Sequence, residues 1–121
     1  MKIAVVDDSR AMRMIVVRTL RQAGFGGHEV FEAENGREGL DVVRTEAPDL
    51  ILSDWNMPEM SGLEFLSALR AHGDMTPFCF VTSEGSEEMR QQAAAAGALG
   101  LIAKPFTAES FADLLAPVVI S

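Results

Sequence analysis

The stretch that decides the fold lies near the start of the chain and reads Ile3-Ala4-Val5-Val6-Asp7-Asp8. Four consecutive apolar residues are followed by two adjacent carboxylates. A continuous apolar run, unlike an alternating one, is typical of a strand that is buried on both faces. The stretch therefore predicts a strand inside a parallel sheet, with acidic side chains at its carboxyl end.

Four further apolar runs follow along the chain. They are Val30 to Ala33 (interrupted by Glu32), Leu50 to Leu52, Phe78 to Val81 and Leu101 to Ala103. The segments between them have helical periodicity, which predicts helices over about Ala11 to Ala23, Asn35 to Ala47, Ser61 to Gly73, Ser86 to Ala96 and Ala108 to Val119. Strand and helix thus alternate five times. This order predicts an α/β fold with a doubly wound, five-stranded parallel sheet.

Individual helices carry recognisable faces and ends. In the first helix, charged arginines surround an apolar set that includes Met14, Ile15, Val17 and Leu20. Asn35 is placed to cap the second helix, and Ser61 with Glu64 forms a capping-box pattern at the start of the third. The fifth has Phe111, Leu114, Leu115 and Val118 as its inward stripe. These patterns predict the helix boundaries to within a few residues.

Composition bounds the class of protein. A chain of 121 residues with 48% hydrophobic residues has the size of one domain and enough apolar surface for a core. Its net charge of −8 disfavours direct binding to nucleic acid. The single cysteine, Cys79, cannot form an internal disulfide, and neither a membrane span nor a signal peptide is evident. We therefore expect one soluble, cytoplasmic domain over residues 1–121.

Polar residues follow the apolar runs where a doubly wound sheet would bind its ligand, at the carboxyl ends of the strands. They are Asp7-Asp8, Glu34-Asn35, Ser53-Asp54, Thr82-Ser83 and Lys104-Pro105. Asp7, Asp8 and Asp54 would be forced together at one edge of the sheet. Such carboxylates raise one another's pKa unless a cation neutralises them.

A divalent cation would neutralise these three carboxylates. An all-oxygen ligand set selects a hard ion, and the small number of protein ligands favours Mg²⁺ over Ca²⁺. His28, His72 and Cys79 fall outside these turns, so the pattern does not predict a zinc site. Taken alone, Asp7 and Asp8 could equally well cap the first helix.

Lys104 and Thr82 add a positive charge and a hydroxyl at the same edge. An ammonium beside a metal and three carboxylates is useful when a further anion, such as a phosphoryl group, arrives between them. Alternatively, Lys104 is a salt-bridge partner of Asp54 or Asp8. Both interpretations can hold, with and without the phosphoryl group.

Taken together, these motifs resemble the receiver domain of two-component response regulators. They are Asp7-Asp8, the run Asp54-Trp55-Asn56-Met57-Pro58 followed by Gly62, Thr82-Ser83, and Lys104-Pro105-Phe106. The resemblance covers essentially the whole chain. Within that family the chain is most similar to the single-domain chemotaxis regulators.

The resemblance implies a flavodoxin-like three-layer sandwich and a phosphoryl transfer from a phosphohistidine of a partner kinase to Asp54. It implies that Mg²⁺ is held by Asp8, Asp54 and the backbone carbonyl of Asn56, with Asp7 acting through water. Lys104 and Thr82 would contact the phosphoryl oxygens. Phosphoryl transfer needs chiefly such positioning and neutralisation of charge.

The resemblance also implies roles for residues around the site. Asn56 and Glu84 would modulate the lifetime of the phosphate, and the peptide bond between Lys104 and Pro105 would be cis. Thr82 would act as a switch together with Leu101. Receivers commonly carry Tyr or Phe at the position of Leu101. A leucine is smaller and has no hydroxyl, so we expect a weaker or differently transmitted coupling between Thr82 and the surface formed by the fourth helix, fifth strand and fifth helix.

The implied partners are a sensor histidine kinase or phosphotransfer protein and a downstream protein, such as a flagellar motor switch. No direct contact with nucleic acid or membrane is implied. The chain would be a monomeric switch and not a turnover enzyme, with dimerisation on phosphorylation left open. It could be complete, or it could be the receiver of a larger regulator with a transcriptional or enzymatic output.

Two functions from other classes share parts of this pattern. A Mg²⁺-dependent phosphohydrolase of the haloacid-dehalogenase type needs Asp-x-Asp at one strand end, but Asn56 stands two residues after Asp54. A flavin-binding module needs a phosphate loop rich in Gly, Ser or Thr after the first strand, where this chain has Asp7-Asp8-Ser9. Neither requirement is met.

Overall fold

A computed structural model describes residues 1–25, 27–104 and 106–120 of the chain, without the side chains of residues 117–120. It contains a five-stranded parallel sheet with strand order β2-β1-β3-β4-β5. The strands are β1 (Lys2–Val6), β2 (Glu29–Ala33), β3 (Leu50–Ser53), β4 (Phe78–Thr82) and β5 (Gly100–Ala103). The chain winds from β1 to one edge and then across to the other, which confirms the predicted doubly wound α/β fold.

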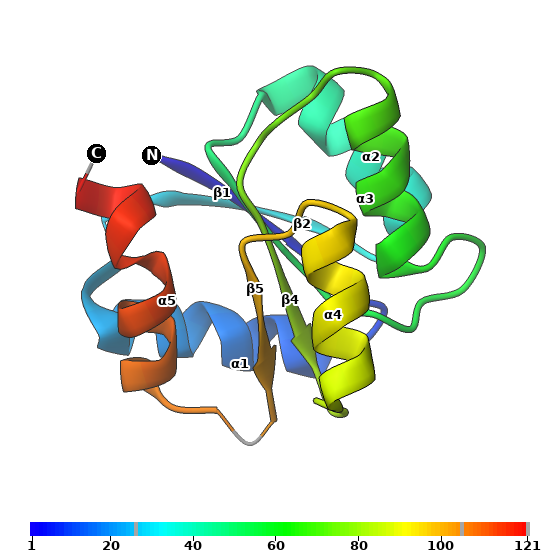
Figure 1. The fold of residues 1–121 in the computed structure, drawn as a ribbon. Helices are drawn as coiled ribbons and strands as arrows, with labels where there is room; N and C mark the ends of the chain where they lie inside the picture. The colour runs from blue at the N-terminus through cyan, green and yellow to red at the C-terminus, as the bar shows by residue number, and fades with distance from the viewer. Residues whose placement is uncertain (26, 105, 121) are drawn as a thin grey trace.

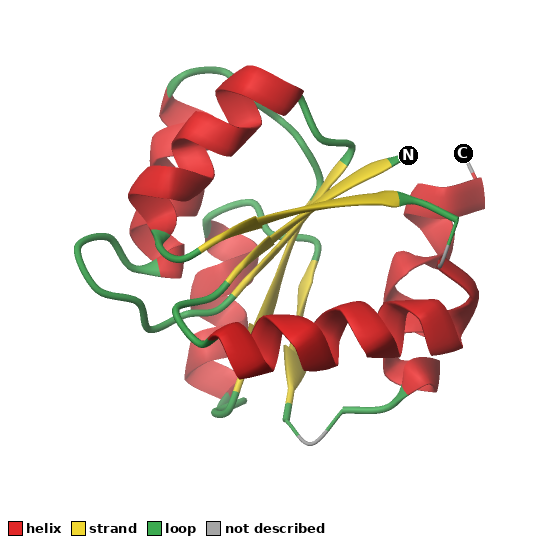
Figure 2. Cartoon of the chain, turned by 180° about the vertical axis from the view of Figure 1, so that it is seen from behind, coloured by secondary structure: helices red, strands yellow, loops and turns green. Residues whose placement is uncertain are grey.

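Helices cover both faces of this sheet (Figures 1 and 2). One face packs against α1 (Arg10–Leu20), the short segment η1 (Arg21–Phe25) and α5 (Ala108–Ile120). The other packs against α2 (Gly36–Glu46), α3 (Gly62–Ala71) and α4 (Glu87–Ala95). Each helix in the described part of the chain is too short or too polar to span a lipid bilayer.

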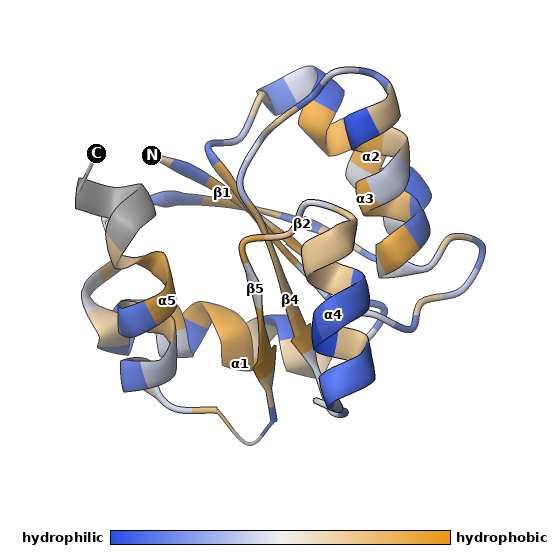
Figure 3. Cartoon of the chain, viewed as in Figure 1, coloured by the Kyte–Doolittle hydropathy of each residue, from blue (hydrophilic) through white to orange (hydrophobic). Residues whose placement is uncertain are grey.

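The core has two halves because successive strand residues point to opposite faces of the sheet. In β1, Ile3 and Val5 join the half under α1 and α5, whereas Ala4 and Val6 join the half under α2, α3 and α4. In Figure 3 the strands in the middle of the sheet are coloured largely as hydrophobic, whereas much of α4 is coloured as hydrophilic. Burial on both faces explains the continuous apolar runs.

The strand β2 is the least buried of the five. Glu29 and Glu32 are exposed, and only Ala33 at its end is fully buried. The strand lies at an edge of the sheet and pairs only with β1. This position accounts for the charged interruption in its apolar run.

The inward face of α1 differs from the one predicted. Val16 and Leu20 are buried, but Met14 and Ile15 are 55% and 44% exposed. In their place the helix turns Arg13 inward, and that residue is only 7% exposed. The α-helix itself ends at Leu20, and η1 continues the helical structure from Arg21 to the predicted end near Ala23.

Helix caps follow the predicted pattern at α3 and partly at α2. Ser61 and Glu64 form the reciprocal capping box at the start of α3. Asn35 accepts a hydrogen bond from the backbone N–H of Glu38 and so caps α2. The cap of α1 is Ser9, whose hydroxyl accepts from the N–H of Met12. Asp7 and Asp8 are therefore free of the capping role that they could have had.

Candidate functional site

Three carboxylates meet at the carboxyl edge of the sheet. Asp7 and Asp8 follow β1, and Asp54 follows its neighbour β3. One carboxylate oxygen from each residue lies within 4.8 Å of those of the other two. The structure thus brings together the three acidic residues that the sequence places at adjacent strand ends.

Asp7 is the most buried of the three. Its backbone N–H donates to the carbonyl of Ala33 (3.0 Å), and its Oδ1 accepts from the N–H of Ser9 (2.9 Å). The residue is 3% exposed. Burial raises the pKa of Asp7 from 3.8 to about 6, and the charges of Asp54 and Asp8 act in the same direction. The Ser9 N–H and the Lys104 ammonium act against this rise.

Asp54 is held by its backbone and by one carboxylate oxygen. Its N–H donates to the carbonyl of Val6 (2.8 Å), and its Oδ1 accepts from the N–H of Trp55 (2.7 Å). Burial raises the pKa of Asp54, while the Trp55 N–H and the charge of Lys104 lower it. The carboxylate is therefore fixed at the end of β3, and the positive charge of Lys104 favours its ionised form.

The loop after Asp54 depends on a glycine. The N–H of Gly62 donates to the carbonyl of Trp55 (2.8 Å). A Cβ atom at position 62 would lie 2.1 Å from the backbone oxygen of Asp54 and 3.0 Å from the Phe80 ring. Only glycine permits this close approach of the start of α3 to the site.

Trp55 is partly buried beside the site. Its ring centroid lies 4.6 Å from that of Phe80, with the two planes tilted by 42°. Phe80 belongs to β4 and is fully buried. The only tryptophan of the chain is therefore packed against the core next to Asp54 and can report on the site by its fluorescence.

Thr82 and Lys104 complete this edge from β4 and from the residue after β5. Thr82 is fully buried, and its hydroxyl accepts from the N–H of Glu84 at 3.4 Å. The backbone N–H of Lys104 donates to the carbonyl of Thr82 (2.8 Å). Among the described residues no direct ion pair involves Lys104, although its charge lowers the pKa of Asp7 and of Asp54. The salt bridge considered for Lys104 is thus absent from this structure.

The remaining residues named from the sequence lie around this centre. Asn56 and Glu84 are exposed, and Leu101 is 6% exposed in β5, where it pairs with Phe80 of β4. Pro105 lies outside the described residues, and so does the cis peptide expected before it. Exposure of Asn56 and Glu84 leaves both able to meet a solvent water.

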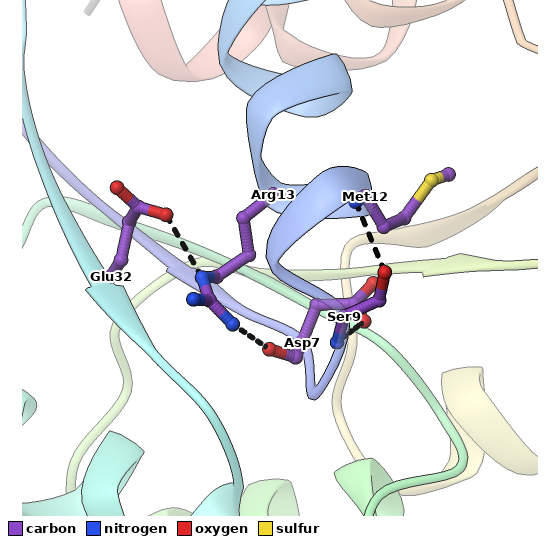
Figure 4. Close-up of polar contacts among 5 residues, drawn as sticks. All are labelled: Asp7, Ser9, Met12, Arg13 and Glu32. Carbon is purple, nitrogen blue, oxygen red and sulfur yellow. Dashed lines mark hydrogen bonds and ion pairs between the residues drawn. The ribbon is translucent and has the colours of Figure 1, made fainter.

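Arg13 is a contact of the site that sequence reasoning missed. Its Nη1 donates to the backbone carbonyl of Asp7 (2.7 Å), and its Nε donates to Glu32 (2.8 Å), as Figure 4 shows. Hydropathy alone assigns Arg13 to the charged face of α1 with the other arginines of that helix. Its spacing of three and seven residues from Val16 and Leu20 is the signal that places it on the buried face.

The residues of the pocket fit a hard divalent cation. Their donors are all carboxylate oxygens, which suit Mg²⁺. Histidine and thiolate ligands lie elsewhere, since Cys79 is fully buried in the core and His28 contacts the N-terminal amine. The desolvation that raises the pKa of Asp7 and Asp54 is a cost that a bound cation would offset.

Comparison with known proteins places the chain in a family. The family model for the response regulator receiver domain matches residues 3–116. The chain is 41% identical to a chemotaxis protein CheY homolog of Campylobacter jejuni, over 98% of this chain and 92% of that protein. It is 38% identical to chemotaxis protein CheY-3 of Vibrio cholerae, over 95% and 88% of the two chains.

Among solved structures, chemotaxis protein CheY4 of Vibrio cholerae superimposes with a TM-score of 0.84. It is 40% identical to this chain, and the match covers 97% of both chains. Family model, curated relatives and structural neighbour agree over nearly the full length of the chain. The chain therefore belongs to the response regulator receiver domain family of two-component systems.

Proposed function

We propose that this protein is a phosphorylation-controlled switch that accepts a phosphoryl group on Asp54. Receiver domains are signalling switches. The observation that carries the proposal is the cluster of Asp7, Asp8 and Asp54, with the charge of Lys104 acting on it. Asp54 has its backbone and one oxygen fixed, which is the preorganisation that a nucleophile needs.

The transfer proceeds from a phosphohistidine of a partner kinase or phosphotransfer protein. A carboxylate oxygen of Asp54 attacks the phosphorus atom in line with the phosphorus–nitrogen bond. That bond breaks as the new phosphorus–oxygen bond forms, and the imidazole leaves and takes up a proton. The product is an acyl phosphate on Asp54, and the reaction needs positioning and charge neutralisation more than covalent help.

Receiver domains bind Mg²⁺ at an acidic pocket, and the pocket of this chain fits that ion. Asp8 and Asp54 would bind it directly together with the backbone carbonyl of Asn56, and Asp7 would bind it through water. When bound, Mg²⁺ neutralises the charge that builds up on the transferring phosphoryl group. The partial burial of the carboxylates strengthens their attraction for the cation, because less solvent screens it.

Lys104 and Thr82 would contact the phosphoryl oxygens. Without phosphate, the Thr82 hydroxyl accepts a hydrogen bond from the N–H of Glu84, and that bond is long at 3.4 Å. Because the hydroxyl is only an acceptor in that bond, its own O–H can donate to a phosphoryl oxygen. Because Lys104 directly follows β5 and Thr82 ends β4, their movement would alter the surface formed by α4, β5 and α5, with Leu101 as the buried link.

The stability of the phosphate would depend on Asn56 and Glu84. Both side chains are exposed next to the pocket and are polar, so they can orient an attacking water. We expect Glu84→Ala to slow the loss of phosphate from Asp54. An unchanged rate of hydrolysis would remove Glu84 from the mechanism.

CheY-type receiver domains interact with histidine kinases and with downstream protein targets. The relatives of this chain favour a chemotaxis pathway with a motor-type target in the cytoplasm. The alternative is a receiver that controls the transcriptional or enzymatic output of a longer regulator. Capture of partners on protein activated with beryllofluoride distinguishes these cases, since motor, kinase and output-domain partners would identify different pathways.

The decisive experiment compares Asp54→Asn with the wild type. Both are incubated with Mg²⁺ and a small-molecule acyl phosphate, and incorporation is followed by intact-protein mass and by Trp55 fluorescence. We expect phosphorylation of the wild type only. Asp41→Asn is the matched control, because this substitution removes the same charge from an exposed face of α2. Phosphorylation of Asp54→Asn at the wild-type rate would refute the assignment.

The same preparation tests the phosphohydrolase alternative. A receiver consumes one phosphoryl group per chain and then turns over only as fast as its acyl phosphate hydrolyses. Sustained rapid release of phosphate from an ordinary phosphomonoester would support a hydrolase instead.

A further inference from the structure

The turn that carries Asp7 and Asp8 is tied to the edge strand β2 at two points. The N–H of Asp7 donates to the carbonyl of Ala33 (3.0 Å). The carbonyl of Asp7 accepts from Nη1 of Arg13 (2.7 Å), and Nε of the same guanidinium donates to Glu32 (2.8 Å). One tie is direct, and the other passes through Arg13.

The Arg13 guanidinium is well suited to hold a backbone carbonyl in place. Its side chain is 8% exposed, whereas that of Glu32 is 48% exposed. A buried guanidinium is retained only when its charge is paired and its N–H groups are bonded. Its planar fork fixes the directions of both bonds at once, which a lysine ammonium cannot do.

The carbonyl that Arg13 holds belongs to the peptide between Asp7 and Asp8. Rotation of this peptide would move both carboxylates, since they are attached on either side of it. The Arg13 bond acts on that backbone carbonyl, whereas the carboxylate charge of Asp7 responds to Asp54, Lys104 and Asp8. Arg13 thus acts on the geometry of the acidic pair through the backbone carbonyl and not through the carboxylate oxygens.

We infer that Arg13, supported by Glu32, is a positioning residue that sets the affinity of the acidic pocket for Mg²⁺. This inference rests on the proposed function, because it takes the carboxylate cluster to be a Mg²⁺ site. Removal of a group that orients a metal ligand through a hydrogen bond typically lowers metal affinity by about 10- to 100-fold.

The test measures Mg²⁺ binding to the unphosphorylated protein by Trp55 fluorescence and, independently, by calorimetry. Arg13→Met should weaken the affinity at least about tenfold. Arg18→Met is the matched control, because it removes the same charge from an exposed position on the same helix. Its affinity should stay within about twofold of the wild type.

Glu32 provides a second pair of variants in case Arg13→Met does not fold. Because Glu32 is half-exposed on an edge strand, its replacement should be tolerated. Glu32→Ala removes the acceptor of Nε and should weaken Mg²⁺ binding, whereas Glu32→Gln keeps an acceptor and should remain close to the wild type. Urea unfolding without Mg²⁺ establishes that each variant is folded under the binding conditions.

A structural role alone would lower stability and leave the Mg²⁺ affinity of the folded protein unchanged. If Arg13→Met and Glu32→Ala are folded and bind Mg²⁺ as the wild type does, the inference is overturned and the proposed function stands. If the wild type itself does not bind Mg²⁺, the proposed metal site fails first. Equal losses of Mg²⁺ affinity in Arg13→Met and Arg18→Met would also overturn the inference, because the effect would then come from the change in net charge alone.

Discussion

Ionised Asp7 should destabilise the metal-free protein at neutral pH, and Asp7→Asn should remove this penalty. The Asp7 side chain is 3% exposed and lies near two other carboxylates. The N–H of Ser9 donates to it, and an asparagine oxygen could accept the same bond. The substitution therefore keeps the local geometry and removes a charge that burial disfavours.

The magnitude follows from the pKa of Asp7, which is 3.8 as a model value and about 6 in the folded protein. A folded pKa above the unfolded one means that the native state binds the proton more tightly. The stability gained from this proton is fully present below about pH 3.8 and is lost as pH rises through about 6. At about 1.36 kcal/mol per pKa unit, the loss amounts to about 3 kcal/mol.

The assay is urea unfolding of Asp7→Asn and wild type without Mg²⁺. At about pH 8 the variant should be more stable by up to about 3 kcal/mol, and about half of this advantage should remain near pH 5. Asp41→Asn is the control, because its side chain is 71% exposed and pairs only loosely with Arg44. It should change stability little at either pH.

Mg²⁺ at a sufficient concentration should make the wild type more stable than Asp7→Asn. A ligand that binds only the native state at about 1,000 times its dissociation constant adds about 4.1 kcal/mol of stability. This gain exceeds the penalty of about 3 kcal/mol, and it would benefit the wild type far more than Asp7→Asn. If Asp7→Asn is no more stable than the wild type at high pH without Mg²⁺, ionised Asp7 carries no penalty in the folded protein. An advantage that does not change between about pH 5 and pH 8 would equally contradict a penalty from ionised Asp7.

Three other substitutions test how the site is supported. Gly62→Ala would place a Cβ 2.1 Å from the Asp54 carbonyl oxygen, so it should lower the free energy of unfolding by about 3 kcal/mol or more and abolish phosphorylation of Asp54. Gly27→Ala, with open space around it, should be tolerated. Urea unfolding and phosphorylation by an acyl phosphate measure both variants. Ser61→Ala removes the cap of α3 and should lower the free energy of unfolding by about 1 kcal/mol. Arg70→Met removes three hydrogen bonds to backbone carbonyls and should cost about 2–3 kcal/mol by the same assay, with unaltered Mg²⁺ affinity.

Sequence patterns were sufficient to predict the strands of the sheet and the acidic residues that meet at its carboxyl edge. Each apolar run is long enough to identify a strand, and chain order fixes which residues follow it. In a parallel sheet those residues must meet at one edge, so the grouping of Asp7, Asp8 and Asp54 follows from local information. The capping box at Ser61 is local in the same way and was predicted correctly.

Faces of helices were harder to predict, and α1 shows why. Met14 and Ile15 are apolar but exposed, while Arg13 is charged but buried. Hydropathy assigns a charged residue to solvent, yet Arg13 has partners on the turn after β1 and on β2. Those partners compensate its desolvation, and they are visible only when distant segments are brought together.

The fold class, the strand ends and the identities of the acidic residues can be predicted from the sequence, because they depend on neighbours along the chain. The burial of Asp7 beside the exposed Asp8 is visible only in the folded structure. The same is true of the buried arginine that holds the peptide between them. The burial and the pKa of Asp7 depend on the elements that pack against its turn. One of these elements is α1, which follows directly, but the other is the edge strand β2, whose residues lie far away in the sequence.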